Sequence, residues 1–142
     1  MTVPPSAVIG GVVVPGDGRG RDLGFPTANL ALDDGILPAD GIYAAWVRID
    51  DDAHPWAASV SVGANPTFAG DRERRVEVHL HDADIDLYGR RLQVQLVAHL
   101  RPTLRFADVP ELIAQTADDV ERCRVLLGAS ALGSAEREGR RL

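Results

Sequence analysis

Apolar and polar residues alternate along much of the first hundred positions of this chain. The alternation is clearest over residues 76–81, where Val, Val and Leu alternate with Glu, His and His, and it recurs over residues 92–100. Residues 8–14, 42–49 and 57–63 are further short runs rich in strand-forming side chains. A period of two is typical of a strand with one buried face. Short strands separated by Gly, Pro and Asp turns favour a sandwich or a small barrel.

The period changes near residue 108, where the spacing becomes helical. Asp108 followed by Glu111 predicts a capping box at the helix start, and Gly128 is a suitable stop. A stripe at helical spacing predicts the face packed on the barrel: Val109, Leu112, Ile113, Thr116, Val120, Cys123 and Leu127. We therefore expect an antiparallel β-barrel with one C-terminal helix within a domain of residues 1–128. We expect the small, charged tail at 129–142 to be flexible.

The composition and net charge of the chain argue against several classes of function. The 142 residues suit one domain, the formal net charge of −6 argues against capture of nucleic acid or an anionic membrane, and no membrane span is visible. The single Cys123 and the lack of a secretory signal lead us to expect a reducing, cytoplasmic setting. Every non-histidine basic residue is Arg, so Walker-type and protein-kinase phosphate sites, which need a lysine, are excluded.

A glycine cluster at Gly16, Gly18 and Gly20 carries the first chemical signal. Successive N–H groups in such a loop form an anion-binding concavity, although a solvated turn explains Gly-Arg-Gly-Arg equally well. Thr27 and Asn29 follow at a spacing that puts both side chains on one side of an extended chain. Two neutral oxygens beside a phosphate cradle indicate a nucleotide–magnesium site.

Glu77 is the leading candidate for a general base. The alternation places it on a strand, opposite the apolar face. Phosphoryl transfer to an alcohol needs a carboxylate that orients the hydroxyl and takes its proton. The plainer alternative, a solvent-facing strand glutamate, stays open at this point.

His79 and His81 suggest a second chemistry, because His-x-His on a strand puts both rings on one face, as in some transition-metal sites. Further histidine ligands would have to be His54 or His99. A calcium loop over residues 82–93 is excluded, because Leu stands where that loop needs glycine and Gln where it needs the bidentate acid.

Taken together, the motifs resemble the riboflavin kinase (flavokinase) family, as in the kinase module of bacterial bifunctional riboflavin kinase/FAD synthetases. The resemblance covers roughly residues 8–127, with order and spacing kept. It rests on residues 16–30 (GDGRGRDLGFPTANL), 37–43 (LPADGIY), 61–68 (SVGANPTF), 76–79 (VEVH), 86–89 (DLYG) and 100–102 (LRP).

This resemblance implies a mainly β fold, a six-stranded antiparallel barrel with a C-terminal α-helix. It also implies Mg-ATP-dependent phosphorylation of the riboflavin 5′-hydroxyl to give FMN and ADP. Glu77 would be the catalytic carboxylate, and Thr27 and Asn29 would hold Mg²⁺ against the ATP phosphates. Residues 16–21 would form a flap over those phosphates through Gly16, Gly18, Gly20 and Arg21.

The resemblance implies further ligand contacts. Tyr88 and Gly89 would lie on the nucleotide side, with His79 and Asp82 as neighbours, and Arg101 and Phe106 would lie near the flavin. Ala83 departs from the family pattern, which has an aromatic residue there, so ligand affinity is in question more than chemistry. A non-catalytic flavin- or nucleotide-binding regulatory module and a metal enzyme using His79 and His81 are the alternatives.

The expected partners are riboflavin/FMN and ATP/ADP, with no nucleic acid and no membrane. Bifunctional relatives carry an adenylyltransferase domain with His-x-Gly-His, and none of the four histidines here begins that motif. FAD synthesis by this chain is therefore not expected. The sequence leaves open a stand-alone kinase or a module that works with an adenylyltransferase domain or FAD synthetase partner.

Overall fold

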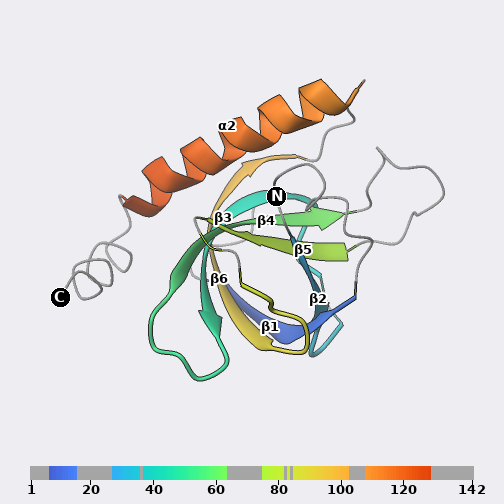
Figure 1. Ribbon diagram of the computed structural model, residues 1–142, viewed down its shortest axis with the longest axis vertical. Helices are drawn as coiled ribbons and strands as arrows, with labels where there is room; N and C mark the ends of the chain where they lie inside the picture. Colours follow the sequence, from blue (N-terminus) through green and yellow to red (C-terminus); the bar gives the residue numbers. More distant parts are fainter. Residues whose placement is uncertain are drawn as a thin grey trace.

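Six strands close into an antiparallel barrel with one helix outside it (Figure 1). The computed structural model describes residues 7–15, 27–35, 37–63, 75–81, 83, 85–102 and 108–128. The strand order around the barrel is β1-β2-β5-β4-β3-β6. The elements are β1 (Ala7–Val14), β2 (Ala28–Leu32), β3 (Gly41–Ile49), β4 (Trp56–Gly63), β5 (Arg75–Leu80), β6 (Arg91–Arg101) and α2 (Val109–Gly128).

Five of these strands coincide within a residue or two with the runs that the alternation predicted. The sixth, β2, has no such pattern: Ala, Asn, Leu, Ala and Leu are weak strand formers. It becomes a strand by pairing with β1 on one side, where Val13 lies opposite Leu30, and with β5 on the other, where Leu30 lies opposite Val76. Pairing with both neighbouring strands therefore stabilises an extended conformation that the local sequence does not favour.

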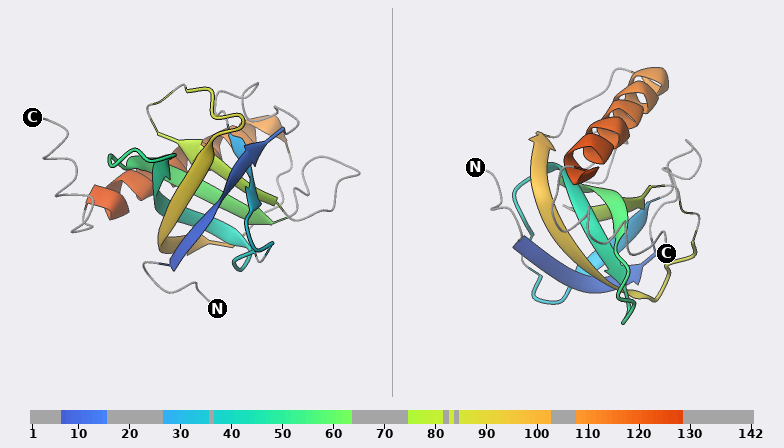
Figure 2. Two further views of the ribbon diagram at one scale, coloured as in Figure 1. Left: turned by 90° about the horizontal axis from the view of Figure 1, so that it is seen from below. Right: turned by 90° about the vertical axis from the view of Figure 1, so that its left-hand side faces the viewer.

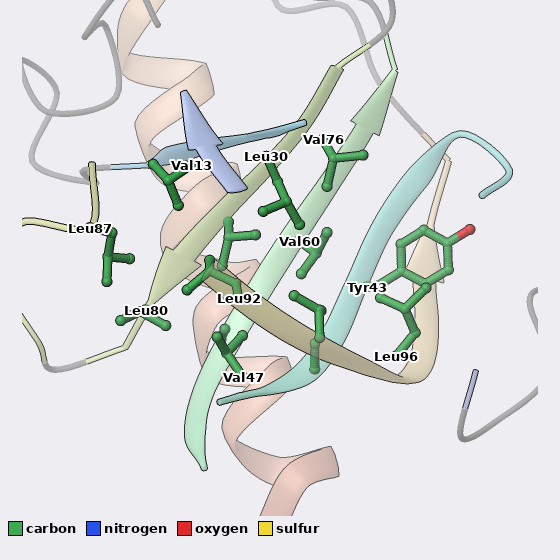
Figure 3. Packing of buried hydrophobic residues seen from close by; sticks show 14 of the residues in the cluster. Val13, Leu30, Tyr43, Val47, Val60, Val76, Leu80, Leu87, Leu92 and Leu96 are labelled. Atoms are coloured by element: carbon green, nitrogen blue, oxygen red, sulfur yellow. The ribbon is translucent and has the colours of Figure 1, made fainter. Parts of the chain in front are cut away.

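The barrel interior is the main core. Figure 3 shows the labelled side chains Val13, Leu30, Val60, Val76 and Leu92 gathered in the space that the strands enclose. Every second residue of β5 belongs to this core, so Val76, Val78 and Leu80 point inward and Glu77 and His79 lie on the outer wall. The expected placement of Glu77 opposite the apolar face is confirmed.

Helix α2 lies along the outside of the barrel (Figures 1 and 2). Its buried Cys123 and Leu127 pack on Ala44 and Trp46 of β3, and partly buried side chains of β4 and β6 complete this second cluster. Asp108 Oδ1 accepts a hydrogen bond from the Glu111 backbone N–H at 2.9 Å, which confirms the N-terminal cap. No helix in the described part of the chain is long and apolar enough to cross a membrane.

The predicted helical stripe is correct toward the C-terminal end and wrong at Ile113, which is 36% exposed. Val120, Cys123 and Leu127 are buried, and Leu112 and Thr116 are half-buried. A helix resting on a convex barrel wall contacts it along a narrow line, so an apolar stripe of ordinary width extends beyond the contact. The expected tail at 129–142 lies outside the described residues.

Candidate active site

The outer wall of the barrel carries one row of residues that contains both leading site candidates. Asn29 of β2 lies directly opposite Glu77 of β5, and Glu77 lies directly opposite Ser61 of β4. Directly opposed side chains in an antiparallel pair have Cβ atoms only about 4.5–5.5 Å apart. Two polar groups predicted from separate motifs, 48 positions apart in the sequence, are therefore neighbours.

Asn29 has an oxygen that suits a cation. Its Oδ1 is buried and has no hydrogen-bond partner among the described residues. An unsatisfied buried acceptor is costly, so its presence needs an explanation. An amide oxygen is a ligand that Mg²⁺ accepts, and Mg²⁺ is usually held by few protein oxygens together with substrate phosphates. Thr27 stands exposed immediately before β2, so both predicted cation ligands lie at the start of this strand.

The turn that carries Tyr88 and Gly89 is fastened beside the same end of β1. Gly89 N donates to Val13 O at 3.0 Å, and Val13 N donates to Arg90 O at 2.9 Å. The next residue, Val14, lies opposite Asn29. The structure therefore brings the predicted nucleotide-side turn to the strand end that flanks Asn29.

Two features fix the shape of this turn. Gly89 has φ +80°, a conformation that favours glycine, and Tyr88 N donates to Asp86 Oδ1 at 3.0 Å. Arg90 Nε donates to Asp50, whose Oδ1 also accepts from Arg91 N at 3.0 Å. The hydrogen bond from the Arg91 backbone, followed by that from the Arg90 side chain, lowers the pKa of Asp50. The Tyr88 side chain remains 65% exposed at the tip.

The histidines do not gather into a metal centre in the described part of the chain. The rings of His79 and His81 are neighbours, with centroids 5.7 Å apart. His99 is elsewhere, edge-on to Tyr43 at 5.0 Å, and His54 is exposed after β3. Within the described ranges, neither His54 nor His99 joins the His79–His81 pair.

Arg101, expected near the flavin, is the last residue of β6 and is held by α2. Its Nε donates to Asp119 Oδ1 at 3.0 Å and its Nη2 to Asp119 Oδ2 at 2.7 Å. The pattern did not single out Asp119. The available signal was a carboxylate at helical spacing within the apolar stripe, four positions before Cys123.

Several predicted site residues lie outside the described residues: Gly16, Gly18, Gly20, Arg21, Asp82 and Phe106. Pro15 and Thr27, the described residues that bound the glycine segment, belong to the same end of β1 and β2 as Asn29. The roles expected for the six stay predictions.

Comparison with known proteins identifies the family of this chain. The family model for riboflavin kinase (flavokinase) matches residues 4–127. A bifunctional riboflavin kinase/FMN adenylyltransferase of Escherichia coli K12 is 43% identical over 120 residues, covering 84% of this chain and 38% of the relative. The corresponding Bacillus subtilis protein is 32% identical over 114 residues, covering 78% of this chain and 35% of the relative.

Two solved structures share the architecture. A Streptococcus pneumoniae structure described as a macrolide-efflux protein has a TM-score of 0.73 and 39% identity, covering 84% of this chain and 38% of that one. Riboflavin kinase from Trypanosoma brucei has a TM-score of 0.68 over 92% of this chain and 85% of that one; at 23% identity it supports the fold alone.

The fold is therefore the six-stranded antiparallel barrel with one helix found in riboflavin kinase. The chain belongs to the riboflavin kinase family. It spans about 38% of the length of the Escherichia coli relative, which carries a second activity in its name.

Proposed function

We propose that this chain is a riboflavin kinase that transfers the γ-phosphoryl group of Mg-ATP to the 5′-hydroxyl of riboflavin, giving FMN and ADP. The observation that carries the proposal is the direct pairing of Asn29 with Glu77 on the outer wall. A candidate cation ligand and a candidate general base on rigid neighbouring strands suit a reaction that depends on positioning and electrostatic stabilisation.

Glu77 acts as the general base in this proposal. Its carboxylate accepts the proton of the riboflavin 5′-hydroxyl as that oxygen attacks phosphorus. The strand backbone on both sides, paired with β2 and β4, limits the positions that this carboxylate can take. A carboxylate on a half-buried strand position is held more firmly than one on a loop.

Asn29 and Thr27 would hold Mg²⁺, and the buried Asn29 Oδ1 is the observation that supports this fit. When bound, Mg²⁺ supplies positive charge to the phosphoryl oxygens. The turn of Tyr88 and Gly89 would lie on the nucleotide side. The arginines of this chain, together with the backbone N–H groups of Gly16, Gly18, Gly20 and Arg21, would supply the positive charge that a lysine supplies in other kinases. In this proposal His79 and Asp82 would contact the nucleotide, and Arg101 and Phe106 would contact the flavin.

The product of this reaction is the substrate of an FMN adenylyltransferase, the second activity named in the bacterial relatives. We therefore infer that an adenylyltransferase domain or partner consumes the FMN made here.

The direct test is to incubate the pure protein with riboflavin and ATP and separate the flavins, with Mg²⁺ omitted and then restored. The proposal expects FMN only when the metal is present. Binding of riboflavin without turnover under any divalent metal would favour the non-catalytic module instead.

A further inference from the structure

Arg101 and Asp119 form a buried ion pair that joins the end of β6 to α2. Their side chains are only 12% and 6% exposed. The pair is bidentate, through Arg101 Nε and Nη2. Arg101 Nη1 also donates to Pro102 O at 2.9 Å, and Gln115 Nε2 donates to Asp119 Oδ1 at 3.1 Å. The guanidinium is thus fixed in both position and orientation.

Stability alone does not explain this arrangement. The nearby contact of α2 with the barrel is apolar, with Cys123 and Leu127 packed on Ala44 and Trp46. Replacing a buried ion pair with apolar residues is often neutral or stabilising, whereas removing one partner is strongly destabilising. An apolar pair would attach the helix equally well, which points to a role for the guanidinium itself.

The pair lies at the far end of the row that contains the candidate active site. Glu77 is opposite Ser61, Ser61 is opposite Ile42 of β3, and Ile42 is opposite Arg101 of β6. Three strand spacings separate Glu77 from Arg101, roughly 14 Å measured along the wall. Because the barrel is closed, the wall curves and the straight distance is shorter. This distance is comparable to the length of a three-ring head with a five-carbon arm.

We propose that Asp119 is a positioning residue that determines riboflavin affinity by holding Arg101 and α2 at the end of this row. This inference rests on the proposed function. Phosphoryl transfer takes place at the Asn29–Glu77 end, so Asp119 affects acceptor binding and leaves the nucleotide side unchanged. Gln115 assists by fixing the carboxylate of Asp119.

Three variants test the proposal: Asp119→Asn, the double variant Arg101→Leu/Asp119→Leu, and Glu121→Gln as the matched control. Glu121 makes an exposed ion pair with Arg124 at 3.7 Å on the same helix, so its loss removes a carboxylate without touching the row. The readouts are the KM values for riboflavin and Mg-ATP, kcat, the melting temperature, and the Kd of riboflavin from flavin fluorescence without ATP.

We expect Asp119→Asn to raise the riboflavin KM and Kd about tenfold, the ratio that follows from losing one well-formed hydrogen bond to a charged group. KM for ATP and kcat should stay within about twofold. The double variant, which leaves no buried charge, should melt near the wild-type temperature and still bind riboflavin about tenfold more weakly. Glu121→Gln should match the wild type in every readout.

Three results would overturn the inference. Normal riboflavin affinity in the stable double variant would make the pair purely structural, and a fall in kcat at unchanged KM would place its effect on the chemistry. If the wild type makes no FMN yet binds riboflavin, the fluorescence arm still decides the role of Asp119 after the kinase proposal has failed. Failure of the wild type to bind riboflavin would contradict both the role of Asp119 and the proposed kinase function.

Discussion

Asn29 and Glu77 lie directly opposite each other where β2 pairs with β5. One belongs to the Pro-Thr-Ala-Asn motif and the other to an alternating strand far along the chain. Their proximity depends on the barrel order, in which the second and fifth strands are neighbours. The candidate site is therefore a product of topology, built on the outer wall while the interior is filled by apolar side chains.

Replacing Asn29 with Ala should separate metal binding from stability. The Mg²⁺ concentration for half-maximal activity should rise by about tenfold to a hundredfold, the range for losing a group that supports a metal site. Stability should not fall, because the substitution removes a buried oxygen without a hydrogen-bond partner in the described structure. Magnesium titration of FMN formation and thermal melting measure the two effects.

Gln93→Ala is the control for that experiment, since Gln93 is an exposed amide side chain on the wall of β6. This substitution should alter neither the Mg²⁺ concentration for half-maximal activity nor the melting temperature. Equal magnesium dependence in the Asn29 variant and the control would remove Asn29 from the cation site.

Two glycines should respond very differently to alanine. Gly41 has φ +148°, and a Cβ there would lie 2.8 Å from Arg101 O and closer still to His99 Nε2. Gly41→Ala should therefore destabilise the barrel by about 3 kcal/mol or more, through strain and overlap together. Gly89, at φ +80° with nothing within 4 Å of a Cβ, should lose only about 1–2 kcal/mol from backbone strain. Urea unfolding of both variants gives the comparison, and equal losses would contradict it.

Cys123 should make stability depend on pH in the alkaline range. Burial raises the pKa of its thiol to about 12, with the Asp119 charge adding to the effect. An unfolded thiol ionises near pH 8.5. The unfolded chain therefore loses this proton first, and the stability from Cys123 should be full below about pH 8.5 and fall as pH rises toward 12, by up to about 1.4 kcal/mol per pH unit.

The measurement is urea unfolding of wild type and Cys123→Ala at several pH values between 8 and 11. The difference between the two proteins isolates the contribution of the thiol, because every other group is common to both. Parallel pH curves would show that the thiol ionises as easily in the folded state. Slow alkylation at pH 8 without urea and fast alkylation with it would show that the thiol is inaccessible in the folded state.

The sequence predicted what local pattern can encode. Alternation placed Val76, Val78 and Leu80 inside and Glu77 outside, because a period of two leaves one face buried. Asp108 capped the helix as its spacing from Glu111 indicated. These features depend on neighbours within a few residues, so one segment suffices to predict them.

The features that the local sequence pattern did not predict depend on contacts between residues far apart in the chain. β2 is a strand because β1 and β5 enclose it, and Ile113 is exposed because the buried contact of α2 with the barrel is made by Cys123 and Leu127 instead. The partner of Arg101 is 18 positions further on and on a different element. No local rule links such residues, although a carboxylate within an apolar helical stripe was a visible sign that a buried cation lay nearby.

The most direct test of the account is the turnover of Glu77→Gln beside the control Glu121→Gln. The glutamine keeps the shape of the side chain on β5 and removes the proton acceptor, so folding and riboflavin binding should be unchanged. We predict that kcat for FMN formation falls by about two to four orders of magnitude in Glu77→Gln, the range for losing a general base, and stays at the wild-type value in Glu121→Gln. Turnover of the Glu77 variant within a few-fold of the wild type would contradict the central claim that Asn29 and Glu77 form the phosphoryl-transfer site.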